Sequence, residues 1–149
     1  MLPEGFDREE FIVRLREKHV RILLPDITFS VEDGWLPLVA KALGDIEKVL
    51  DKHSMTSRSQ VRQIKEKLGD LRIYVRPRRE SYRFTKALAA DLDDIRDRSV
   101  RKSLKTCEIC GDVGELGNFA GYYQTLCKRH ADRRLKWIAD GRMGDPFDD

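Results

Sequence analysis

The chain of 149 residues contains no apolar run close to the roughly 20 residues that a membrane-spanning helix needs. It also lacks internal repeats and low-complexity tracts. The first residues, 1–5, have neither the basic nor the apolar region of a signal peptide. From these absences we expect a soluble protein in the reducing cytoplasm.

Cysteine is scarce as well, and three cysteines cannot all be paired in disulfides. All three belong to two short motifs, Cys107-x-x-Cys110 and Cys127-x-x-His130. Free thiolates and imidazoles are the side chains that bind Zn²⁺, and two close pairs supply the four donors of a tetrahedral site. The spacing therefore predicts a zinc site made of Cys107, Cys110, Cys127 and His130.

Four protein ligands leave no open position for water, which favours a structural over a catalytic zinc ion. Coincidental pairs in a core and an iron–sulfur cluster are the alternatives, although histidine is an uncommon ligand of such clusters. A zinc nuclease would need further histidines beside the site. The remaining two, His19 and His53, are distant in sequence, and we expect both to be ordinary histidines.

Charge is abundant but nearly balanced, with 37% charged residues and a net charge of +3. Residues 57–86 hold ten Lys or Arg against three Asp or Glu, and 127–136 hold five against one. Residues 26–56 hold three basic against six acidic side chains, and 87–97 hold one against four. This alternation is consistent with internal ion pairing or with a polarised surface, and both readings stay open.

The sequence predicts three helices within residues 1–104. Asp7 is a suitable N-cap for a helix that ends near His19, and a second helix begins near Asp33 or Gly34. The second helix carries a wide apolar stripe consisting of Trp35, Leu38, Val39, Ala42, Leu43, Ile46, Val49 and Leu50. Residues 53–60 are polar and are expected to form a loop. A long helix is expected later in the chain, from about Ser81 to Leu104.

Alternating apolar and basic residues predict a β-hairpin over 63–75 that turns at Gly69-Asp70. Its buried side is expected to carry Ile64, Leu68, Leu71, Ile73 and Val75. Its other side carries Lys65, Lys67, Arg72, Tyr74 and Arg76. A basic and aromatic mixture of this kind is typical of surfaces that bind nucleic acids, but it also suits the exposed side of any antiparallel sheet.

The metal motifs flank a second expected hairpin and open a last helix through Ala139. Gly111 follows the second thiolate, where a zinc knuckle often needs a positive φ. We expect either Tyr122 or Tyr123 to pack under the zinc ion. Knuckle, hairpin and helix together resemble a treble clef. The predicted fold is α+β, with a helical and hairpin body at 1–104 and a docked zinc module at 105–149.

Basic residues also follow the first hairpin, at Arg78 and Arg79, and occur on the last helix. On that helix we expect Leu135 to share the ligand-bearing side. Three basic side chains are expected on the opposite side, where they suit contact with phosphates: Arg129, Arg133 and Lys136. A solvated helix face is the alternative, because the spacing allows Asp132–Lys136 and Lys136–Asp140 ion pairs.

Three sequence blocks resemble a family of small, uncharacterised bacterial and phage zinc-binding proteins. These are Gly34-Trp35-x-Pro37-Leu38, Gln63-x-Lys65-Glu66-Lys67-x-Gly69-x-Leu71-Arg72-x-Tyr74-Val75, and Thr106-Cys107-Glu108-x-Cys110-Gly111 with Gly121-Tyr122-x-x-Thr125-Leu126-Cys127-x-x-His130. The resemblance covers about residues 34–131 and implies a single zinc fold without implying a reaction. Tyr122 stands where the family often has tryptophan.

The sequence contains no Ser-His-Asp arrangement, phosphate-binding loop or convincing pair of catalytic carboxylates, so we expect no enzymatic activity. The leading hypothesis is a zinc-stabilised regulator that contacts nucleic acid or a nucleoprotein through its basic surfaces. The alternative is a protein-binding inhibitor or immunity-type protein, encoded by a phage or prophage and directed at a host defence system or toxin. Tyr74, Tyr123 and Trp137 are its candidate anchors.

Overall fold

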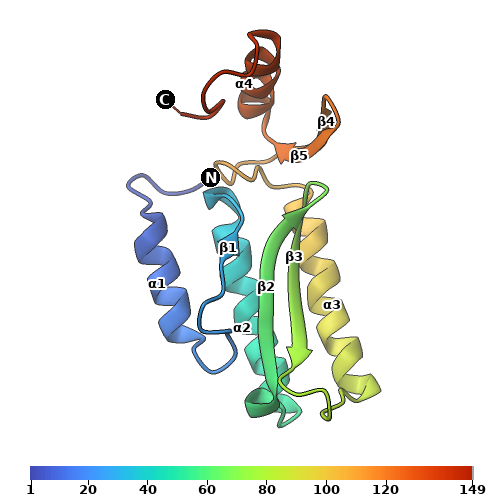
Figure 1. The fold of residues 1–149 in the computed structure, drawn as a ribbon. Helices are drawn as coiled ribbons and strands as arrows, with labels where there is room; N and C mark the ends of the chain where they lie inside the picture. The colour runs from blue at the N-terminus through green and yellow to red at the C-terminus, as the bar shows by residue number, and fades with distance from the viewer. Residues whose placement is uncertain (149) are drawn as a thin grey trace.

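The computed structural model describes residues 1–148 and contains the helices and strands of an α+β fold (Figure 1). The body consists of α1 (Arg8–Lys18), β1 (Phe29–Ser30), the 3₁₀ turn η1 (Asp33–Trp35), α2 (Leu36–Lys52), the 3₁₀ turn η2 (Thr56–Arg58), β2 (Ser59–Lys67), β3 (Asp70–Pro77) and α3 (Lys86–Ser103). The upper part consists of β4 (Glu115–Phe119), β5 (Tyr122–Leu126) and α4 (Lys128–Ala139). None of the helices within 1–148 has the length and apolar character needed to cross a bilayer.

The core of the body lies between helices and one face of a three-stranded sheet. Most of the expected α2 stripe is buried, and Leu43 and Leu50 are completely covered, whereas Leu38 and Val49 are partly buried against the core. The sheet has the order β1-β2-β3, and α2 and α3 both lie behind β2 and β3 in Figure 1. Ile64 and Ile73 pair across the two long strands and face these helices. The opposite face of the sheet is not covered by either helix.

The first hairpin differs from its prediction in the position of its turn. The strands turn at Leu68 and Gly69, where φ is +52° and +87°, as in the tight turns whose twist matches that of the strands. Leu68 is consequently 65% exposed, and its predicted burial beside Ile64 is wrong. A bulge between Val61 and Gln63 shifts the register and preserves the alternation of the remaining residues.

Strand β1 and the start of helix α3 were not predicted. Strand β1 pairs in parallel with β2, with Phe29 opposite Ile64, but two residues are too short to show a period in sequence. Helix α3 begins at Lys86 rather than near Ser81, because the Thr85 side chain caps it by accepting a hydrogen bond from the Leu88 amide. Residues 78–85 thus form an irregular connection after β3, with a turn closed by a hydrogen bond from the Tyr82 amide to the Arg79 carbonyl.

The upper part is joined to the body at the start of α2. The Gly34 amide donates to the Glu108 carbonyl at 2.7 Å, and the Trp35 indole donates to the Thr106 carbonyl at 2.8 Å. Trp35 is completely buried. A β-carbon on Gly34 would lie only 2.2 Å from the Cys107 carbonyl oxygen, so this approach requires glycine.

The tip of the first hairpin forms the second attachment. The Thr125 hydroxyl of β5 donates to the Gly69 carbonyl at 2.7 Å. The Leu71 amide in β3 donates to the Ser103 hydroxyl at the end of α3 at 2.9 Å. The turn that leads into β3 is therefore held between the upper part and the last turn of α3.

Gly34→Ala is expected to lower the free energy of unfolding by at least about 2 kcal/mol, because a methyl group there overlaps fixed backbone atoms. Gly44→Ala is the matched control. Gly44 lies inside α2 with nothing within 4 Å of an added β-carbon, so alanine should stabilise the protein by up to about 1 kcal/mol. Urea unfolding followed by circular dichroism measures both values. Equal stability of the two variants would contradict the role assigned to Gly34.

Candidate metal centre and basic face

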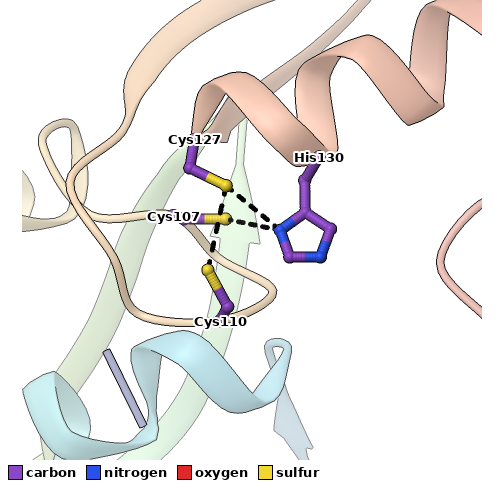
Figure 2. Close-up of side chains that lie close together, drawn as sticks. All are labelled: Cys107, Cys110, Cys127 and His130. Atoms are coloured by element: carbon purple, nitrogen blue, oxygen red, sulfur yellow. Dashed lines mark hydrogen bonds between the residues drawn. The ribbon is translucent and has the colours of Figure 1, made fainter.

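Four predicted ligands meet at one point above the body (Figure 2). Cys107 and Cys110 belong to the loop between α3 and β4, and Cys127 is the N-cap residue of α4. His130 lies in the first turn of α4, on the same side as Cys127. Gly111 has a φ of +79°, as expected for the residue that closes the knuckle.

The four ligand atoms lie within 4.8 Å of one another, and three of their separations are close to those of a tetrahedral site. The Sγ atoms of Cys110 and Cys127 are 3.8 Å apart, and Nδ1 of His130 lies 3.5 Å from Sγ of Cys107 and 3.2 Å from Sγ of Cys127. Bonds of about 2.3 Å to sulfur and 2.0 Å to nitrogen give separations of about 3.8 Å and 3.5 Å in a tetrahedron. A disulfide needs about 2.05 Å between sulfurs, so the thiols are free. The four residues can hold one metal ion.

The two buried thiols, Cys107 and Cys127, have pKa values shifted in opposite directions by their surroundings. Burial raises the pKa of the Cys107 thiol to about 12. Burial acts to raise the pKa of Cys127 too, but hydrogen bonds from the His130 backbone and from the neighbouring thiols lower it below its ordinary value. Binding of a metal ion displaces such thiol protons. The N-terminus of α4 favours the resulting negative charge.

Phe119 and Leu126, rather than a tyrosine, pack beneath the ligands. The His130 ring meets Phe147 edge-on, with the centroids 5.5 Å apart. Tyr122 and Tyr123 are 45% and 41% exposed, so the prediction that one of them packs under the metal is wrong. The next residue of β5, Gln124, is buried instead, and its side-chain amide donates a hydrogen bond to the buried carboxylate of Glu108.

A polar cleft of about 920 Å³ adjoins the metal centre, between the body and α4. Glu108 lines this cleft and also accepts a hydrogen bond from the Glu32 amide. Burial raises the pKa of Glu108 to about 7. Arg134 also faces the cleft, where it donates to the side-chain carbonyl oxygen of Gln124 and lies 5.0 Å from the Tyr122 ring. On α4 it is thus Arg134 that faces inward, whereas Leu135 is 53% exposed, against expectation.

The remaining histidines lie away from the metal centre. His19 is buried at the end of α1, with Nδ1 3.6 Å from the Glu47 carboxylate, and burial lowers its pKa. His53 follows α2 and pairs with Asp91 of α3 at 2.8 Å. Both histidines therefore serve contacts within the body.

The basic side of the first hairpin lies on the uncovered face of the sheet. The Tyr74 ring has the Lys65 ammonium 5.6 Å and the Arg76 guanidinium 5.3 Å from its centroid. Lys67 is exposed at the end of β2. Arg72 differs from these, because the Asp70 carboxylate binds it at 2.6 Å and raises its pKa.

Arg78 and Arg79 follow the basic side of the first hairpin in the chain, directly after the end of β3. Arg78 donates to the Arg21 carbonyl, and Arg79 lies 5.8 Å from the Tyr82 ring. The sequence did not single out Arg58, Arg62 or Tyr82. The two arginines are among the ten basic residues counted in 57–86. Arg62 donates to the carbonyls of residues 77 and 78, and Arg58 lies 5.2 Å from the Tyr82 ring.

The basic residues of α4 are separate from this face, since α4 lies at the opposite end of the sheet from residues 76–79 (Figure 1). Lys136 pairs with Asp140 as the spacing allowed, but Asp132 pairs with Lys128. Arg133 donates to the Asp148 carbonyl at 2.8 Å. Arg129 makes no ion pair within residues 1–148.

Two substitutions at the ligands are expected to abolish metal binding. Purified protein should contain one metal ion per chain by elemental analysis, whereas Cys110→Ser and His130→Gln should contain almost none. Loss of the ion should lower the free energy of unfolding by at least about 3 kcal/mol, since the four ligands join the knuckle to α4 through the ion. His53→Gln is the control and should retain the ion. Full stability of metal-free Cys110→Ser would contradict a structural role.

Comparisons with protein-family models, with curated proteins and with solved structures find no significant match to this chain, so its resemblance to the phage and bacterial zinc proteins stays a prediction.

Proposed function

We propose that this protein is a non-enzymatic, zinc-stabilised binding module that contacts nucleic acid or a nucleoprotein through the basic face of β2, β3 and the segment after them. The zinc assignment is supported by three sulfur donors and one nitrogen donor within 4.8 Å of one another, with three of their separations close to tetrahedral values. A complete protein ligand set leaves the ion no open position, which favours a role in holding the fold.

The choice of nucleic acid as the proposed partner rests on one observation, the scarcity of acidic partners for the basic segment. Of the ten Lys and Arg side chains in residues 57–86, Arg72 is the one that pairs with a carboxylate within residues 1–148. The acidic segments have other partners, in the pairs Asp33–Arg8, Asp45–Lys41, Asp51–Arg21, Asp91–Lys52 and Asp93–Arg96. Internal ion pairing therefore does not neutralise the basic segment. Its positive charge remains at the surface, where phosphates are suitable counterions.

A protein partner is the second candidate, and exposed apolar side chains of the upper part support it. Leu116 and Tyr123 are each more than 40% exposed on the second hairpin, and Val113 is 82% exposed beside it. Such a surface suits an inhibitor or immunity-type protein of a phage or prophage, directed at a host defence system or toxin. This candidate requires one stoichiometric protein partner whose recovery survives nuclease treatment.

Nucleic-acid binding is expected to depend steeply on salt and on the basic face. In fluorescence anisotropy at low salt, the triple variant Lys65→Gln/Arg76→Gln/Arg79→Gln should bind at least about tenfold more weakly. The slope of log affinity against log salt should become shallower by about 0.7–0.9 for each phosphate that the variant no longer neutralises.

The matched control removes exposed charges from the helical side of the body. Arg98, Arg101 and Lys102 are exposed on α3, and Arg98→Gln/Arg101→Gln/Lys102→Gln removes the same number of charges as the basic-face variant. It should change affinity less than about twofold. Unchanged mobility of both DNA and RNA at low salt would rule out the nucleic-acid proposal. Equal weakening in the two variants would show that binding follows net charge alone.

A further inference from the structure

Two tyrosines at the basic face have the same surroundings. The Lys65 ammonium and the Arg76 guanidinium each lie over the Tyr74 ring, and the Arg58 and Arg79 guanidinium groups each lie over the Tyr82 ring. All four cations lie 5.2–5.8 Å from the respective ring centroid. Each site thus places one aromatic ring directly beside two positive charges.

These rings are placed where a ligand can reach them. Tyr74 is on the face of β3 that turns away from α2 and α3, and it is only partly buried. Exposed Gln63 lies directly opposite it on β2. Tyr82 lies in the connection after β3, which η2 holds in place through a 2.8 Å bond from the Arg78 amide to the Arg58 carbonyl.

A groove extends the same face toward β1. It has a volume of about 530 Å³ and lies along β2. Arg62, Gln63 and Lys65 line one side and residues 24–30 the other, and two carboxylates, Asp26 and Glu66, also line it. Two cations and one amide, Arg62, Lys65 and Gln63, therefore continue from the Tyr74 site along the strand, beside these two carboxylates. The surface has an elongated, partly concave shape that suits a chain molecule.

We infer that this face binds single-stranded nucleic acid, with unpaired bases stacked on Tyr74 and Tyr82 and phosphates bound by the cations beside them. The inference rests on the proposed function and names its substrate class. Base–aromatic stacking requires an open base face, which single strands offer and which a duplex covers with neighbouring base pairs. The amide of Gln63 can donate to and accept from the edge of a stacked base.

The arrangement of charges also favours a single strand over a duplex. A duplex accepts a helix in its major groove, and α4 is the basic helix of the upper part. Its side chains Lys128 and Lys136 are bound to acids of the same helix, which reduces their contribution to phosphate binding. Lys65, Arg76, Arg58 and Arg79 contact rings instead of acids, so their charges can turn to phosphates while the rings take bases.

The test compares one sequence of about 16 nucleotides as single-stranded DNA, single-stranded RNA and duplex DNA, by anisotropy at fixed low salt. Both single strands should bind more tightly than the duplex, and their order identifies the preferred sugar. Tyr74→Ala should weaken single-strand binding about 5- to 100-fold without changing the salt slope. Tyr74→Phe should retain binding, since phenylalanine keeps the ring.

Controls separate stacking from charge and from folding. Lys65→Gln/Arg76→Gln should weaken single-strand and duplex binding alike and reduce the salt slope. Tyr123→Ala removes an exposed tyrosine of the second hairpin and should have no effect. Tyr82→Ala provides an independent test should Tyr74→Ala fail to fold. Duplex binding as tight as single-strand binding, with Tyr74→Ala and Tyr82→Ala unaffected, overturns the inference alone. Absence of binding to all three probes overturns the proposed function as well.

Discussion

The contact between the start of α2 and the metal knuckle is the constraint on which the rest of the structure depends. The main chains of Gly34 and Cys107 approach closely enough that a single β-carbon would overlap a carbonyl oxygen. The Gly34 amide and the Trp35 indole then satisfy two carbonyls at the knuckle inside the protein. Buried polar groups of this kind lose their partners together if the knuckle moves. The metal ligands and the main core belong to separate hydrophobic clusters, and these backbone contacts join the two directly.

This coupling gives the proposed zinc ion a role beyond its own ligands. Thr125 is two residues from Cys127, and its hydroxyl holds the carbonyl of Gly69 at the tip of the first hairpin. Ser103, four residues before Cys107, holds the amide of Leu71 on the strand that follows. A metal ion that fixes the knuckle and β5 thereby fixes the turn between β2 and β3. The orientation of the basic face follows from the metal centre through these hydrogen bonds.

Much of the metal centre and of the element order could be predicted from sequence, because both depend on local spacing. Two i, i+3 ligand pairs and the apolar stripe of α2 are short-range patterns. The failures involve competition between local and tertiary effects. Leu68 has the right alternation for burial, but the backbone turns there and exposes it. Tyr122 and Tyr123 are large and apolar enough for a core, yet Phe119 fills that space from the facing strand. Strand β1 is defined by its partner alone.

A count of charges along the chain overestimates the unpaired positive charge of the last helix but not that of the first hairpin. The difference follows from the geometry of helices and strands. On a helix, side chains four residues apart are neighbours, so Asp132 and Asp140 neutralise Lys128 and Lys136. On a strand, neighbours on one face are two residues apart or lie across the ladder. The face of β2 and β3 has basic, aromatic and amide residues at those positions, with Asp70 as the acid at its end. The excess of Lys and Arg is therefore partly screened on α4, at Lys128 and Lys136, whereas on the sheet Arg72 alone pairs with a carboxylate within residues 1–148. The functional proposal rests on the sheet for this reason.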